Sequence, residues 1–212
     1  MSVMPRPIIA LAALSLAAAG CADRDLTAGP PAAAPHTTSG LIQRLAGSSL
    51  AGAHRAPAVA TAVVTDPARF VQTTGDLFAD RHAAAARLSG AGFVAGATRT
   101  YASAHRSARS MVLRFADPAS ARAGAARLLL DARRTRLSDD LCDISTPMGR
   151  VAGVPGARGV LVNHRTTSGV PTKAATIVFT DGPFVVDVSA EAEGAAPVAR
   201  LQRAARRAYR VS

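Results

Sequence analysis

Two Asp-Pro steps constrain the fold of this chain most strongly. They are Asp66 with Pro67, and Asp117 with Pro118. An aspartate caps a helix by accepting backbone N–H bonds, and a proline is favoured at the first helical position, where no N–H is needed. The first step predicts a helix to about residue 88, and the second predicts one to about residue 134. Because an apolar, strand-like segment precedes each step, the chain is predicted to mix strands and helices.

Six segments have the alternating or compact apolar composition of strands. Asp181 and Gly182 separate the last two and indicate a tight hairpin. A final helix is predicted over residues 195–211. The order β-α-β-β-α-β-β-β-α predicts a single α+β domain, with a mainly antiparallel sheet and helices packed on one face. The predicted strands are residues 58–64, 93–102, 109–116, 159–166, 173–180 and 184–191.

The first twenty residues have the layout of a secretory signal peptide, with Arg6, then an uncharged apolar run over residues 8–19, then small residues. The run ends in LSLAAAGC, where small residues directly precede Cys21 as they do in a bacterial lipobox. A lipobox usually has Leu three residues before its cysteine, and this chain has Ala18 there. The sequence therefore predicts that the thiol of Cys21 carries a diacylglyceryl group. The alternative is a freely secreted protein with an unrelated cysteine.

Residues 22–40 are rich in Pro, Ala, Gly and Thr, which is typical of a tether. We expect a signal peptide over 1–20, then Cys21 with a tether and a short irregular segment to residue 57, then an ectodomain over 58–212. No stretch offers about 20 apolar residues for a spanning helix, so the lipid is the predicted membrane contact. With Cys21 lipidated, Cys142 has no intramolecular partner. The sequence predicts no particular oligomeric state.

The chain is strongly basic, with 25 Lys and Arg against 14 Asp and Glu, a formal net charge of +11. An exported address argues against nucleic acid as the partner, so anionic lipid or an anionic envelope polymer is expected instead. Arg200, Arg203, Arg207 and Arg210 recur at helical spacing and predict an arginine stripe that contacts such a surface. The alternative is an ordinary amphipathic helix whose basic face lies in water.

The sequence contains no pattern typical of catalysis, of a metal site or of a cofactor site. Three residues, His105, His164 and Asp187, are the candidates for a catalytic site assembled from distant segments. The densest group of metal-ligand types is more simply interpreted as a solvated acidic loop. It comprises Asp139, Asp140, Cys142 and Asp143.

Two stretches, GFVAGATRTYAS…SMVLRFADPASARAGAARL and ATIVFTDGPFVVDVSA, resemble the secreted lipoproteins of mycobacteria and related actinobacteria. The shared pattern is a strand that ends in Phe-Ala-Asp, an Ala- and Arg-rich helix, and a later hairpin whose second strand resembles GPFVV. The resemblance spans about residues 58–210. It implies a lipoprotein address and a similar fold, and it assigns no catalytic residue.

Three hypotheses about function follow from the sequence. The first is a lipid-anchored envelope protein that acts as a non-enzymatic binding or interaction module. The second is a carrier that holds a lipid or small apolar molecule between sheet and helices, since Ala-rich helices fill space poorly. The third is a hydrolase of envelope polymers whose site follows no known motif.

Overall fold

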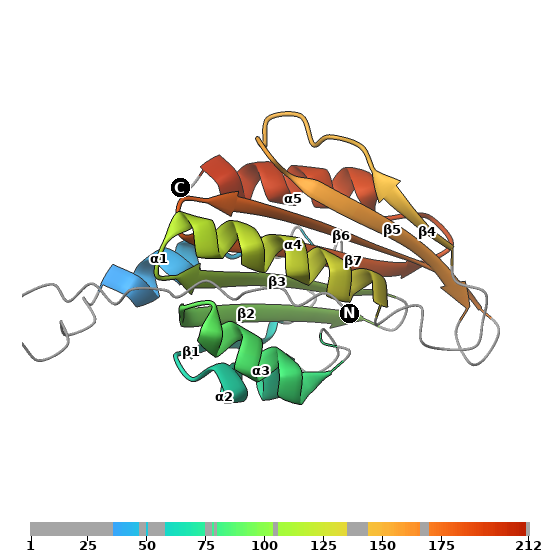
Figure 1. The fold of residues 1–212 in the computed structure, drawn as a ribbon. Helices are drawn as coiled ribbons and strands as arrows, with labels where there is room; N and C mark the ends of the chain where they lie inside the picture. The colour runs from blue at the N-terminus through green and yellow to red at the C-terminus, as the bar shows by residue number, and fades with distance from the viewer. Residues whose placement is uncertain are drawn as a thin grey trace, which may run out of the picture. The chain divides into compact units, whose positions relative to one another are not determined.

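Seven antiparallel strands form one twisted sheet in the order β1-β2-β3-β7-β6-β5-β4 in the computed structural model (Figure 1). The structure describes residues 36–46, 50, 58–74, 78, 80–103, 106–134, 144–165 and 170–210. All of them belong to the compact unit Pro35–Ser212. The strands are β1 Ala58–Val64, β2 Phe93–Ser103, β3 Arg106–Phe115, β4 Ile144–Met148, β5 Arg158–Arg165, β6 Pro171–Asp181 and β7 Phe184–Glu193.

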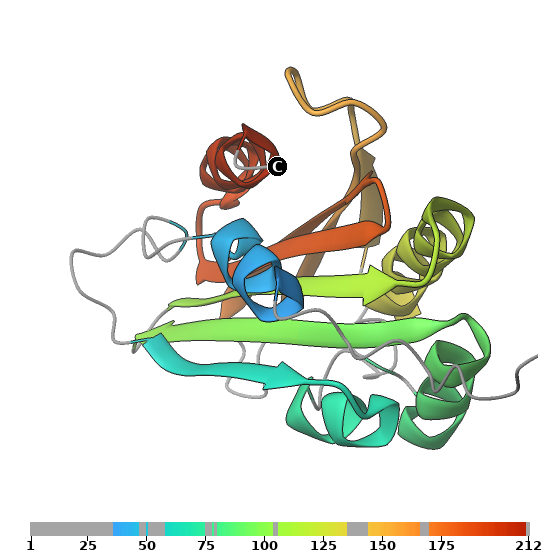
Figure 2. The same ribbon diagram turned by 90° about the vertical axis from the view of Figure 1, so that its left-hand side faces the viewer.

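Helices cover both faces of this sheet (Figure 2). One face, called the α5 face below, packs against α1 (His36–Arg44) and α5 (Val198–Arg210). The other, called the α4 face, packs against α2 (Pro67–Thr74), α3 (Arg81–Gly90) and α4 (Pro118–Arg134). The predicted α+β class and antiparallel sheet are confirmed, whereas the prediction of helices on one face is wrong.

The composition of the central strands explains why both faces are covered. Val185 of β7 packs on the α4 face and Val186 on the α5 face, and β6 likewise places Val178 and Ile177 on opposite faces. All four side chains are at most 2% exposed. A continuous apolar run of this kind marks a strand that is buried on both sides, so one layer of helices cannot cover it.

Both Asp-Pro steps begin helices as predicted. Asp66 Oδ1 accepts the N–H of Arg69 at 2.6 Å, and Asp117 Oδ1 accepts the N–H of Ser120 at 2.9 Å. The predicted helix over residues 67–88 is instead two helices, because Asp80 caps a new one by accepting the N–H of Ala83 at 2.9 Å. The sequence signal was therefore correct for helix starts and wrong for this helix end.

Between α4 and β5, where the sequence analysis predicted no strand, the chain forms the short edge strand β4. Pro147 lies within β4, which only an edge strand tolerates well. Two turns follow, in which Val154 N–H bonds to Val151 O and Ala157 N–H bonds to Val154 O. These three side chains, each at most 5% exposed, pack into the core of the α5 face.

The folded unit also begins earlier than predicted, because α1 lies inside the range assigned to the tether. Leu41 of α1 and Leu45, the residue that follows the helix, are 0% and 6% exposed. Two side chains of the sheet then hold the backbone of Ala46: its N–H donates to Ser110 Oγ at 2.8 Å, and Tyr101 Oη donates to its carbonyl at 3.0 Å. Composition alone does not identify this segment as part of the fold, because its two leucines are buried only by packing against the sheet.

Candidate functional site

The helix α5 docks on the sheet through a narrow apolar stripe. Leu201, Ala204, Ala205 and Ala208 are buried. The ring of Tyr209 meets that of Phe179 edge to face, with centroids 6.0 Å apart. Small side chains therefore bring α5 close to the sheet and leave its basic side chains on the outward face.

The outward face of α5 is uniformly basic. Arg203, Arg207 and Arg210 are exposed and Arg200 is half-buried, so the structure places the four predicted arginines along one side of the helix. Arg206, which the sequence analysis did not include, is a fifth and is half-buried. The helix sequence VARLQRAARRAYR contains no acidic residue. Within α5 itself, no carboxylate offsets these charges.

Arg200 lies where positive charge is most concentrated. Burial lowers the pKa of its guanidinium, and the nearby charges of Arg106 and Arg203 lower it further. Like charges held together in this way repel one another, and an anion placed among them would relieve that repulsion. The first turn of α5 is thus the part of the helix best suited to a negatively charged partner.

A loop rich in small residues lies beside α5. Residues 150–158 of this loop line a pocket of about 400 Å³. Arg150 and Arg158, the first and last residues of that segment, are both exposed. Gly153 faces the stem of Arg206: a β-carbon added at this glycine would lie 3.6 Å from Arg206 Cδ. The loop therefore packs beside α5 at Gly153, whereas Arg158 pairs with Val178 of β6 and so lies on the α4 face.

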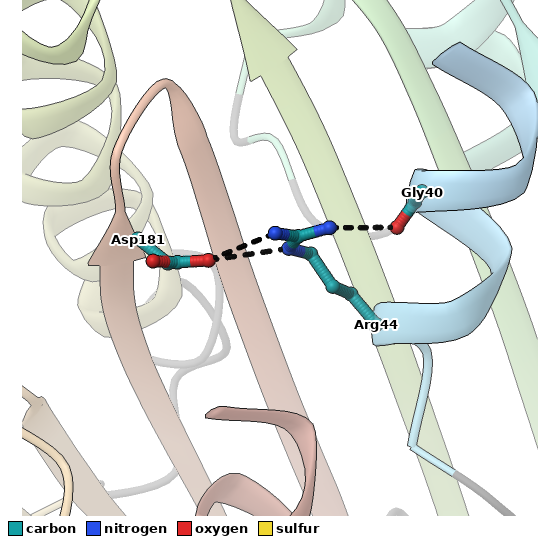
Figure 3. A network of polar contacts seen from close by, with 3 residues as sticks. All are labelled: Gly40, Arg44 and Asp181. Carbon is teal, nitrogen blue, oxygen red and sulfur yellow. Dashed lines mark hydrogen bonds and ion pairs between the residues drawn. The ribbon is translucent and has the colours of Figure 1, made fainter. Parts of the chain in front are cut away.

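The helix α1, which enters the fold directly after the predicted tether, packs beside α5 (Figure 2). Arg44 fixes it to the β6–β7 hairpin (Figure 3). The Nε and Nη2 atoms of Arg44 donate to Asp181 Oδ2 at 3.3 and 3.0 Å, and Nη1 donates to the carbonyl of Gly40 at 3.2 Å. The guanidinium carbon also lies 4.1 Å from the ring centroid of Phe184.

This placement limits how far a lipid on Cys21 could lie from α1. Fifteen residue steps separate Cys21 from the first residue of α1, His36. A chain of that length spans at most about 50 Å, at roughly 3.3–3.6 Å per residue.

Two of the candidates for a catalytic site, His164 and Asp187, are not brought together. Asp187 is 1% exposed, and its Oδ1 accepts a hydrogen bond from Ser189 Oγ at 3.0 Å. The strand register places Asp187 level with Val178 of β6, which is level with Arg158 of β5. His164 lies six positions further along β5. At about 3.3 Å per residue, roughly 20 Å separates the backbone of His164 from that level, which is too far for direct proton transfer.

A small polar pocket of about 190 Å³ lies near this aspartate on the α4 face. It is lined in part by Thr100, Ser107 and Glu191, and by Arg109, whose Nη2 donates to Ser189 Oγ at 3.5 Å. The arrangement can hold a small polar molecule or water by hydrogen bonds. Ser189, whose hydroxyl donates to the buried Asp187, also lines this pocket.

Several predicted residues lie outside the described residues. These are Cys21, His105 and the acidic group Asp139, Asp140, Cys142 and Asp143. Among the residues that the structure does describe, no three ligand-type side chains are grouped to hold a metal ion. Over the same residues, no helix has the length and apolarity needed to cross a bilayer.

Comparisons with known proteins find no match among curated sequences. One solved structure that is similar to this chain is the extracellular domain of PknH from Mycobacterium tuberculosis, at 13% identity and a TM-score of 0.49. The match covers 82% of this chain and 95% of that one. A family model described as "Domain of unknown function (DUF7373) N-terminal" matches residues 43–212, from within α1 to the C-terminal residue. Because the match covers most of the chain, this protein belongs to the DUF7373 family.

Proposed function

We propose that this protein is a lipid-anchored, extracytoplasmic and non-enzymatic module that holds the outward face of α5 against the anionic surface of the membrane. One observation carries the proposal: a helix with five arginines and no acidic residue packs beside α1, where the predicted tether enters the fold. The lipobox at Cys21 supports the anchor.

The physical basis is local electrostatics combined with tethering. Each basic residue near an anionic leaflet contributes about 1 kcal/mol, and the attraction fades beyond a Debye length of about 8 Å. Two acyl chains on one cysteine give stable anchoring, whereas one chain binds only marginally. A tether then keeps α5 at a high effective concentration next to the headgroups, so weak individual contacts are enough.

Mass spectrometry of the mature N-terminus tests the anchor. We expect the native chain to begin at Cys21 with a diacylglyceryl thioether and to fractionate with membranes. Cys21→Ser should lose both the lipid and the lipid-dependent membrane association. If the native protein and Cys21→Ser distribute identically between membrane and soluble fractions, the lipobox interpretation is wrong.

Vesicle co-sedimentation of the unlipidated unit Pro35–Ser212 tests the basic face. We expect binding to vesicles that contain phosphatidylglycerol and little binding to pure phosphatidylcholine. Reversing two α5 charges, Arg203→Glu with Arg207→Glu, should weaken binding at least about tenfold, given the contribution of each basic residue. The matched control is Arg69→Glu with Arg122→Glu, which changes net charge equally at exposed positions on the α4 face. Equal losses in both double variants would refute the assignment of the contact to α5.

A further inference from the structure

A groove of about 160 Å³ runs between α3 and α4, on the face of the sheet opposite α5. Its walls are almost entirely apolar, and the ring of Phe115 on β3 lies between them. Small residues leave this space. Gly124 of α4 has no room for a side chain, because an added β-carbon would lie 2.7 Å from Phe115 Cζ. On the other side, α3 lines the groove with Ala84, Arg87 and Leu88.

The groove is long and narrow. Along α4 its lining residues extend from Ala123 to Asp131, which at a rise of 1.5 Å per residue is about 12 Å. Its volume is close to that of an engineered apolar cavity of about 150 Å³ that stays dry and binds benzene. A space of this length and volume suits a segment of one alkyl chain and is too small for a two-chain lipid.

Charged side chains lie at the end of the groove where Asp131 of α4 lines it. Asp131 has a side chain only 3% exposed, and Arg127 Nε lies 3.2 Å from its Oδ1. Arg87 of α3 reaches across, with Nη2 3.8 Å from Asp131 Oδ2. Both arginine side chains are more than a third exposed. Two guanidinium groups around one carboxylate leave an excess positive charge at the rim of an apolar groove.

We propose that this groove binds one alkyl chain of an anionic amphiphile, with the carboxylate or phosphate head against Arg87 and Arg127. Apolar walls match the chain, and the positive rim matches the head. Both guanidinium groups pair with the one carboxylate of Asp131, and both arginine side chains are still more than a third exposed, so each can also meet an anionic head. The site lies on the α4 face, so it is independent of the contact proposed for α5.

Calorimetric titration of the full chain carrying Cys21→Ser, with decanoate as the probe, tests the groove. A tryptophan at Ala123 fills it, while a tryptophan at Ala126 is the matched control, since both residues are exposed on α4 and only Ala123 lines the groove. We expect one decanoate per chain. Ala123→Trp should weaken binding at least about tenfold because the chain loses its buried methylene contacts. Ala126→Trp should bind as the parent does.

The head is tested with decyltrimethylammonium, which has the same chain length and the opposite charge. It should bind at least about tenfold more weakly than decanoate, and Arg87→Gln should narrow that difference. Equal binding by Ala123→Trp and Ala126→Trp would show that the groove is not the site. Equal binding of the two probes would overturn the anionic head. If decanoate does not bind and Ala123→Trp abolishes a dimer of the parent chain, the groove is an interface between two copies instead.

Discussion

The ion pair between Arg44 and Asp181 is the sharpest test of how α1 is held on the sheet (Figure 3). We would replace Arg44 by Met, which keeps the aliphatic stem, and Asp181 by Asn, separately and together. The double-mutant cycle then separates the interaction of the two side chains from the other losses that each substitution causes.

The expected coupling follows from the burial of the pair. Exposed pairs contribute about 0.2–1 kcal/mol, whereas removing one partner of a fully buried pair costs about 3–5 kcal/mol. Here the two side chains are 15% and 27% exposed, and two guanidinium nitrogens donate to one carboxylate oxygen. We therefore expect a coupling free energy of about 1–2 kcal/mol. Arg44→Met alone should cost more, because it also loses the contact with the Phe184 ring, worth about 0.5–1 kcal/mol.

Urea denaturation of the unit Pro35–Ser212 at equilibrium measures these free energies. The four proteins should unfold with equal dependence on urea and different midpoints. A coupling free energy below about 0.3 kcal/mol would refute the argument, since that is the error expected for independent sites. Such a result would mean that Leu41, Leu45 and the backbone of Ala46 hold α1 on the sheet, and that the pairing of Arg44 with Asp181 adds no measurable stability.

Three further predictions concern the free energy of unfolding, measured by urea denaturation. Gly96→Ala should lower it by about 1–3 kcal/mol through overpacking, because the added β-carbon would lie 2.3 Å from Phe70 Cε2. Phe70→Leu in the same chain should restore part of that loss, and additive effects of the two substitutions would contradict the clash. Tyr101→Phe should cost about 1–2 kcal/mol by the same measurement, because it leaves the buried carbonyl of Ala46 without its donor, and unchanged stability would contradict that role. Hydrogen bonds from Ser120 lower the pKa of Asp117 below 3.8, so its stabilisation is present above that pH and is lost as pH falls through the folded-state pKa. The urea midpoint of Asp117→Asn should therefore lie below that of the parent chain at pH 7 and approach it below about pH 4, and a difference independent of pH would contradict the cap.

The elements that sequence reasoning located well are those whose signals are local. Asp66 and Asp117 begin helices because the capping side chain and the capped N–H groups lie within three residues of each other. The hairpin between β6 and β7 was also predictable. Gly182 and Pro183 occupy its two central positions, and Gly182 has φ +54°, as a type II′ turn requires at its first central residue.

The features that were missed depend on contacts between distant segments. The docking of α1 rests on Tyr101 and Ser110, more than fifty residues away in the sequence. The second helical layer could have been inferred from the unbroken apolar runs around Ile177 and Val185, which alternation does not explain. Such runs signal a strand with two buried faces, and this was the available clue that the prediction did not use.

The candidate site likewise combines a feature that the sequence could predict with features that depend on contacts between distant segments. Helical spacing found the stripe from Arg200 to Arg210, because one helix carries it. Spacing could not indicate that the loop over residues 150–158 packs beside Arg206, nor that α1 lies next to α5. The groove between α3 and α4 could not be predicted either, since Arg87 and Asp131 meet only when the two helices pack on the same face of the sheet.

The central claim is that α5 faces the membrane, and a pair of single-tryptophan variants tests it most directly. The chain contains no tryptophan, so Ala199→Trp on α5 and Ala119→Trp on α4 each introduce one fluorophore, at exposed positions on opposite faces. The lipidated protein is reconstituted in phosphatidylglycerol-containing vesicles with bromine on the acyl chains close to the headgroups. The account predicts strong quenching at position 199 that high salt removes, and weak quenching at position 119. Equal quenching at both positions, or stronger quenching at 119, would contradict it.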